Sequence, residues 1–288
     1  MGIFLGILAA VSWGVTDIFI ALLTRLIGTT RALLLTQTGC LVATIIVACV
    51  TWSRYGSGYP RIWELIAVCG ICHVAGMLFM YRAFEIGTLS LVSPIGSGFA
   101  IVTALLAAIT GEHLANRELI GAGLLVAGVI MATRSSPSGI GKVSFAGVPE
   151  AFGSALAFGT MFWLMEYIVP STGPFKVLVV LRFMALSGAA ALFAAQRNKT
   201  VETVPVLNAR VFGLTSAVVA TDMIAWIAFN FGIESRQHVT VITALTSLYS
   251  AVTVLLSWMI FKDRLNRGQW IGVSAIFLGI VLVSFHFN

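Results

Sequence analysis

Long apolar runs, each close to the length of a membrane-crossing helix, recur along the whole chain and are joined by short polar segments. A bilayer core requires about 20 consecutive, mostly apolar helical residues for each crossing. Hydrophobic residues make up 59% of the 288 residues, charged residues only 10%, and the mean hydropathy is +1.00. A soluble domain is closer to half apolar and a quarter charged, so this chain must place most of its surface in lipid. We therefore expect an all-α integral membrane protein.

The apolar runs divide into ten expected membrane-spanning helices. We expect a first five-helix repeat at residues 1–133, a polar connecting loop at 134–146 and a second five-helix repeat at 147–288. The ten expected helices cover residues 2–23, 32–52, 62–82, 88–110, 117–133, 147–168, 175–195, 209–230, 238–261 and 267–286.

Part of the first half recurs in the second half. Residues 93–132 and residues 243–284 each hold two apolar runs joined by a short polar turn. Adding 151 to the earlier numbers aligns Glu112 with Asp263, Leu114 with Leu265, Gly121 with Gly272 and Gly128 with Gly279. A repeat at that distance halves the chain, so one unit is built twice. Because five is odd, the second unit must enter the membrane in the opposite orientation, as in the inverted repeats of many secondary transporters.

The basic residues give one indication of orientation. Most of the 17 Lys and Arg residues fall in the expected loops opposite the termini. Basic loops favour the cytoplasmic side of a membrane, so charge alone places both termini outside the cytoplasm. The net charge of +6 arises from these short loops and does not indicate nucleic-acid binding.

Both halves resemble the EamA-type half of the drug/metabolite transporter superfamily. The resemblance covers nearly the whole chain and rests on the residues Gly111-Glu112-His113-Leu114, Lys262-Asp263-Arg264-Leu265, Tyr81-Arg82-Ala83-Phe84 and Ser93-Pro94. It implies ten helices in two inverted five-helix repeats around a central cavity, lined by spans 1, 3, 4, 6, 8 and 9. Members of this superfamily move small metabolites, often outward. They usually keep both termini in the cytoplasm, which opposes the indication from charge, so the orientation stays open.

Two ionisable residues on corresponding spans are candidates for proton coupling. A charge inside hydrocarbon costs at least ~2.5 kcal/mol, so an ionisable residue within a span is a functional hypothesis by default. An offset of 149 places His73 of span 3 opposite Asp222 of span 8. The same offset pairs Met77 with Trp226 and Tyr81 with Asn230, and each trio lies along one helix face. We expect a carboxylate and an imidazole beside a shared cavity, where Asp222 could bind and release a proton.

A structural reading of these residues remains open beside the functional one. Arg182 in span 7 is the clear basic residue within a span, and it could pair with Asp222 or Asp17 simply to hold the bundle together. His73, taken alone, is more often a buried histidine with satisfied hydrogen bonds than a proton carrier.

Aromatic and polar residues supply candidates for substrate binding. Asp17 follows Trp13 by four residues, so the carboxylate and the indole share a face and suit an ammonium group. The second half does not repeat this pair, because adding 145 reaches Phe158 and Phe162 instead. An aromatic cage could include Trp13, Phe158, Phe162, Trp163, Trp226 and Tyr249, although the same rings could serve only packing. Pro94 frees a backbone carbonyl in span 4, where Ser97 and, in span 9, Thr246 could add hydrogen bonds.

These patterns favour a secondary transporter. Our leading hypothesis is export of a small amine-bearing or aromatic metabolite, such as an amino acid, in exchange for protons. The alternative is uptake or facilitated diffusion of a quaternary ammonium compound through the aromatic cage. A remote alternative is an intramembrane enzyme, although the chain lacks HExxH, GxSxG, DDxxD and P-loop motifs. A receptor or scaffold would bind its ligand without moving it.

The remaining expectations concern partners and location. The four cysteines lie in apolar runs, and the CxxC spacing of Cys69 and Cys72 has no second pair, so we expect buried thiols and neither a metal site nor a cofactor. We expect a small-molecule substrate, protons and lipid as partners, and no nucleic acid. Ten spans can close a cavity alone, so we expect a monomer in a cell membrane, such as a bacterial inner membrane.

Overall fold

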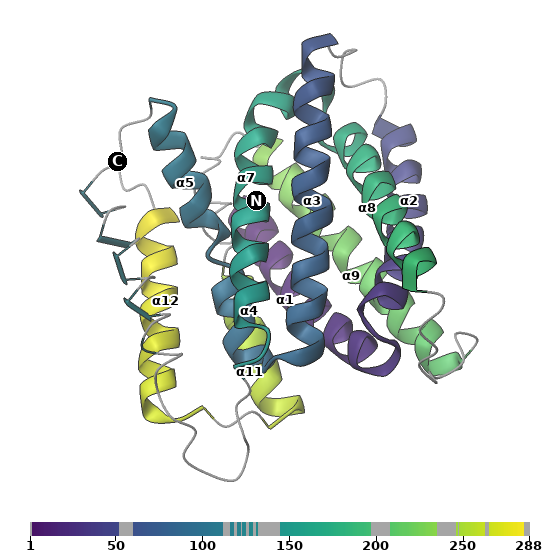
Figure 1. Cartoon of the computed structure of the whole chain (residues 1–288). Helices are drawn as coiled ribbons and strands as arrows, with labels where there is room; N and C mark the ends of the chain where they lie inside the picture. The colour runs from purple at the N-terminus through teal and green to yellow at the C-terminus, as the bar shows by residue number, and fades with distance from the viewer. Residues whose placement is uncertain are drawn as a thin grey trace.

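The computed structural model describes residues 2–51, 60–111, parts of 116–131, 145–196, 208–234, 246, 248–262 and 265–284. Throughout these residues the chain forms helices joined by short turns (Figure 1). The helices are α1 (Gly2–Ile27), α2 (Thr29–Thr51), α3 (Pro60–Ile86), α4 (Leu89–Gly96), α5 (Phe99–Ile109), α7 (Val148–Thr172), α8 (Pro174–Gln196), α9 (Ala209–Glu234), α11 (Tyr249–Ile260) and α12 (Arg267–Ser284).

The helices α1, α2, α3, α7, α8 and α9 agree with the expected spans to within a few residues. Seven helical segments are long and apolar enough to cross a membrane, namely α1, α2, α3, the pair α4 and α5, α7, α8 and α9. The expected spans at 117–133 and 238–261 lie only partly within the described residues. The first is helical at 117, as is residue 116 before it, and the second contains α11. The polar turns at 112–115 and 263–264 and most of the connecting loop lie outside the described residues.

The span predicted at 88–110 is interrupted. It consists of α4 and α5, which meet at a tight turn at Ser97 and Gly98. The hydroxyl of Ser97 donates to the carbonyl oxygen of Pro94 at 2.8 Å, and the amide of Gly98 donates to Ile95 at 3.1 Å instead. A side-chain donor that occupies a helical carbonyl competes with the regular backbone pattern.

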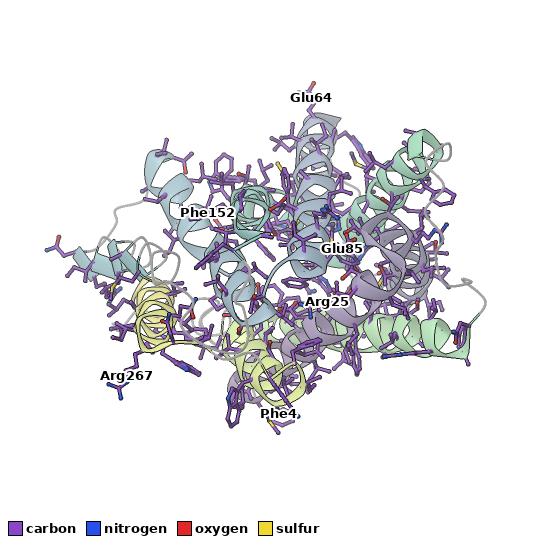
Figure 2. The ribbon with its side chains drawn as sticks, turned by 60° about the horizontal axis from the view of Figure 1, so that its bottom comes forward. Phe4, Arg25, Glu64, Glu85, Phe152 and Arg267 are labelled. Carbon is purple, nitrogen blue, oxygen red and sulfur yellow. The ribbon has the colours of Figure 1, made fainter. Side chains whose placement is uncertain are left out.

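The two halves of the chain pack against each other helix by helix. α1 lies along α9, α3 lies along α7, and α2 packs against α8. α5 packs on α7 as α11 packs on α1. Large apolar side chains cover the outside of the bundle, as Figure 2 shows for Phe4 at its rim. Such an extended exposed apolar surface requires lipid around it.

Two glycines allow close contacts between helices of the two halves. A Cβ atom on Gly14 of α1 would lie 2.6 Å from Val252 Cβ and 2.8 Å from the Tyr249 carbonyl oxygen. A Cβ atom on Gly159 of α7 would lie 2.4 Å from Val102 Cβ and 2.8 Å from the Phe99 carbonyl oxygen. Contacts this short exclude any side chain, so both helices need glycine to approach their neighbours.

Candidate functional site

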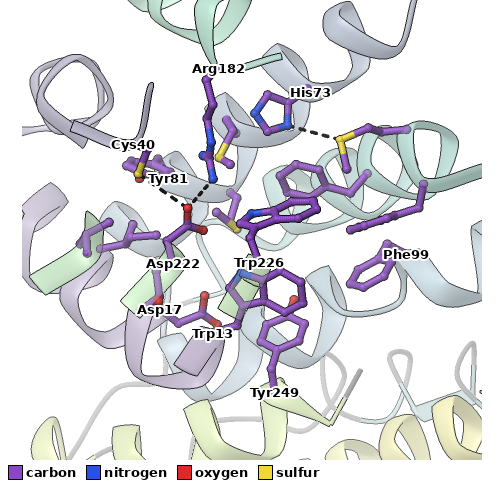
Figure 3. A pocket seen from close by; sticks show the side chains of 18 residues that line it. Trp13, Asp17, Cys40, His73, Tyr81, Phe99, Arg182, Asp222, Trp226 and Tyr249 are labelled. Carbon is purple, nitrogen blue, oxygen red and sulfur yellow. Dashed lines mark hydrogen bonds and ion pairs between the residues drawn. The ribbon is translucent and has the colours of Figure 1, made fainter. Parts of the chain in front are cut away.

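A cavity lies among helices of both halves (Figure 3). Its empty volume is about 690 Å³, including space continuous with the exterior. Eleven of the predicted site residues line it, namely Trp13, Asp17, His73, Met77, Tyr81, Phe158, Phe162, Arg182, Asp222, Trp226 and Tyr249.

One wall of the cavity holds an ion pair. Arg182 on α8 donates through Nη2 to the Oδ2 atom of Asp222 on α9, and through Nη1 to the Oε1 atom of Gln37 at 3.1 Å. Arg182 is 1% exposed and Asp222 is 7% exposed. The thiol of Cys40 lies 3.6 Å from the same carboxylate oxygen. The pairing that the sequence left open is therefore between Arg182 and Asp222.

The second carboxylate of the cavity has a different environment. Asp17 on α1 is 4% exposed, and its Oδ2 atom accepts hydrogen bonds from Ser93 Oγ at 2.9 Å and Thr253 Oγ1 at 2.8 Å. Ser93 belongs to α4 and Thr253 to α11. Within the described part of the chain, Asp17 forms no ion pair with Lys or Arg. The side-chain partners that the described residues offer to this carboxylate are thus two hydroxyl groups.

Aromatic rings line the cavity beside Asp17. The rings of Trp13 and Trp226 meet edge to face with centroids 5.4 Å apart. Phe162 stacks on Trp226 at 6.3 Å and on Phe99 at 4.9 Å, and Phe99 in turn stacks on Tyr249 at 6.4 Å. Aromatic faces attract cations, and flat rings stack on them, so this wall suits either an ammonium group or an aromatic ligand.

His73 and Tyr81 have partners within the bundle. The Nδ1 atom of His73 lies 3.3 Å from Met161 Sδ, and its Nε2 atom is buried without a hydrogen bond. The hydroxyl of Tyr81 lies 2.9 Å from Thr36 Oγ1. His73 and Asp222 both line the cavity, but each has another partner and they form no hydrogen bond with each other.

Five predicted site residues do not line the cavity. The amide of Asn230 donates to the Trp226 carbonyl oxygen at 2.8 Å within its own helix. Trp163 packs edge to face on Tyr167 at 5.5 Å. Pro94 and Ser97 are buried at the turn between α4 and α5, where they bond to each other. Thr246 is buried away from the cavity lining.

Several functional candidates were missed from the sequence. Phe99, Met80, Met161 and Cys40 line the cavity, and Ser93, Thr253 and Gln37 hold its charged groups. Phe99 could have been found from the repeat, because Phe99 and Tyr249 occupy matching positions against Gly159 and Gly14. The offset of 151 used for the repeat aligns Phe99 with the residue after Tyr249, and so misses this match by one position. The hydroxyl donors give no such signal, since Ser and Thr are common in apolar helices.

Metal-binding geometry is not found in the described part of the chain, where no group of three His, Cys, Asp or Glu side chains could hold a metal ion. The groups of the cavity that can contact a ligand are one ion pair, one carboxylate bound by hydroxyl groups and a set of aromatic rings.

Comparisons with known proteins agree with this architecture. The chain is similar to a solved crystal structure, described only as that of a protein, at 15% sequence identity and a TM-score of 0.62. That similarity covers 98% of this chain and 96% of the other. None of the curated proteins matches. The model of the EamA-like transporter family matches twice, at residues 1–134 and 145–285. The chain therefore belongs to the EamA-like transporter family, as a multi-pass membrane transporter of the drug/metabolite type.

Proposed function

We propose that this protein is a secondary active transporter that exports a small amine-bearing or aromatic metabolite in exchange for protons. The observation that carries the proposal is Asp17. It is a carboxylate in the central cavity that, among the described residues, accepts hydrogen bonds from two hydroxyl groups and faces a wall of aromatic rings. An ammonium group would supply the positive charge that the described protein residues do not supply to it.

The two carboxylates of the cavity suit different roles. Asp222 already has a basic partner in Arg182, so a proton or a ligand cation must displace that arginine to reach it. Breaking a buried ion pair leaves an uncompensated charge and is costly. Asp17 has no such partner among the described residues. We therefore assign the binding of cation and proton to Asp17 and regard the coupling role predicted for Asp222 and His73 as the alternative.

Competition for one carboxylate gives exchange without further machinery. A protonated Asp17 carries no negative charge and attracts no ammonium, whereas an ionised Asp17 binds one. If either the proton or the substrate, but not both, occupies Asp17, then the proton gradient drives the substrate in the opposite direction. The aromatic rings would contribute the affinity for the rest of the substrate.

We also propose that the two halves are inverted five-helix repeats, with ten helices in all. The matching contacts support this arrangement. In the first half, Gly14 contacts Tyr249 and Val252 of the second half. In the second half, the equivalent Gly159 contacts Phe99 and Val102 of the first half. The two glycines are 145 positions apart, and each pair of equivalent partners is 150 positions apart. The reciprocal packing of α1 on α9 and of α7 on α3 fits the same relation. The cavity would then lie between the repeats, as in other secondary transporters.

Transport by the purified protein in liposomes tests this function. We would follow tyramine, phenylalanine and tetramethylammonium as probes, with a pH-sensitive dye on one side of the membrane. Proton-coupled exchange predicts that a pH gradient drives tyramine or phenylalanine against its own gradient and that protons move in the opposite direction. Flux of tetramethylammonium that ignores the pH gradient would favour an aromatic-cage uniporter instead. Binding without any flux would indicate a receptor.

A further inference from the structure

A second, smaller pocket lies next to the central cavity. It is lined by Met80 and Tyr249, which the two cavities share, and by Ala83, Phe84, Val92, Ser93, Gly96, Ala151 and Ser154. These residues come from the end of α3, from α4, from the beginning of α7 and, for Tyr249, from the beginning of α11. The small pocket therefore extends from the cavity toward the face of the bundle where α3 ends and α7 begins, which we call the Gly87 face.

Two hydroxyl groups give this apolar pocket a polar character. Ser93 lines the small pocket and also donates to Asp17 in the central cavity, so one side chain touches both sites. Ser154 is 1% exposed, and its Oγ atom has no hydrogen-bond partner. A buried hydroxyl without a partner costs free energy and can be satisfied by a ligand.

Close backbone contacts join the end of α3 to the beginning of α7 at the Gly87 face. A Cβ atom on Gly87 would lie 2.7 Å from the Ala146 carbonyl oxygen, and one on Gly147 would lie 2.8 Å from the Ala83 carbonyl oxygen. Arg25, at the end of α1, donates to the carbonyl oxygens of Phe84 at 3.1 Å and Gly87 at 2.9 Å. Figure 2 shows Arg25 beside Glu85 in this region.

Arg25 also joins this face to the second half of the chain. Its guanidinium lies 4.6 Å from the ring centroid of Phe261, which follows α11. The same small set of contacts therefore connects α1, α3, α7 and α11 directly beyond the small pocket. Among the described residues, these contacts lie between the pocket and the Gly87 face, and each of them can part without unfolding a helix.

We propose that the small pocket is a second binding site, which receives the ammonium end of the substrate after it leaves Asp17 on its way to the Gly87 face. Ser93 and Ser154 accept hydrogen bonds from the ammonium group, and Met80 and Tyr249 form the boundary that the substrate must pass. Opening requires the Arg25 contacts and the Gly87–Gly147 contact to separate. This inference rests on the proposed transport function, and it adds the route and its transit site.

Filling the small pocket tests the route. Ser154→Phe places a ring in the pocket without touching Asp17. We expect binding to the central cavity, measured by tryptophan quenching, to stay within twofold of wild type. We expect flux of whichever probe the wild type transports to fall at least tenfold. Ser187→Phe is the matched control, because Ser187 is exposed on the outside of α8 and the same ring there should leave flux unchanged.

A second variant covers the case in which Ser154→Phe does not fold. Ser154→Cys would be purified, shown to transport, and then treated with a bulky maleimide, with identically treated wild type as the control for the four native thiols. Modification should block flux in the variant only. Normal flux through a filled pocket would overturn the route while leaving the transport function intact. Joint loss of binding and flux would also overturn it, because Ser154 would then belong to the central site.

Discussion

The hydroxyl of Thr253 donates to the carboxylate of Asp17 over 2.8 Å, and so joins α11 of the second half to α1 of the first inside the cavity. Ser93 of α4 donates to the same oxygen atom at 2.9 Å. A ligand or proton that engages Asp17 therefore acts on contacts between three helices. A change in the charge of Asp17 therefore directly affects how the two halves pack against each other.

The ion pair between Arg182 and Asp222 should matter for stability. Arg182→Met and Asp222→Leu each leave one buried charge without its partner, at a cost of about 3–5 kcal/mol. We expect both single variants to unfold at lower temperature than wild type in detergent. The double variant should recover most of the loss, because apolar side chains of similar size can replace a buried pair. A double variant that loses the sum of both single effects would contradict this account.

Gly14 should tolerate no side chain. Gly14→Ala places a Cβ atom against Val252 and the Tyr249 carbonyl oxygen, so α11 must shift at a cost of about 1–3 kcal/mol. We expect a lower unfolding temperature and weaker probe binding, since the shift also moves Thr253 away from Asp17. Gly213→Ala is the control, because a Cβ atom there meets nothing within 4 Å. Equal unfolding temperatures for the two variants would show that α1 and α11 are not closely packed.

Trp226 should report ligand binding. Its indole lies between Trp13 and Phe162 in the cavity wall, so a bound probe changes its surroundings. We expect Trp226→Phe to remove more than half of the fluorescence change on probe binding. Trp258→Phe should leave that change intact, because Trp258 is 55% exposed on the outside of the bundle. The opposite ranking would place the ligand outside this cavity.

Much of the fold was predictable because apolar length and periodicity determine membrane-spanning helices. The helices α1, α2, α3, α7, α8 and α9 begin and end within a few residues of the expected spans. The turn at Ser97 and Gly98 was not predicted, because it depends on one hydroxyl that bonds the Pro94 carbonyl oxygen rather than on hydropathy.

The site was predictable where charge was conspicuous. Asp17, His73, Arg182 and Asp222 stand out as ionisable residues in apolar runs, and all four line the cavity. The sequence left the partner of Arg182 open, because helix faces give no distances between helices. It also missed Ser93 and Thr253, whose roles follow only from the approach of α4 and α11 to α1. Asn230 does not line the cavity, and its amide donates to a carbonyl oxygen of its own helix.

Proton-coupled exchange in the Asp17→Asn variant tests the central claim most directly. Asparagine keeps the size of the side chain and an oxygen that accepts from Ser93 and Thr253, but it cannot ionise. In liposomes, with the same probes and pH gradient, we expect Asp17→Asn to lose at least ninety per cent of the proton-driven flux while remaining folded. We expect Asp222→Asn, measured in the same assay, to lower the unfolding temperature because it removes the charged partner of Arg182. Proton-driven flux that persists in Asp17→Asn and disappears in a folded Asp222→Asn would contradict the account and assign coupling to Asp222.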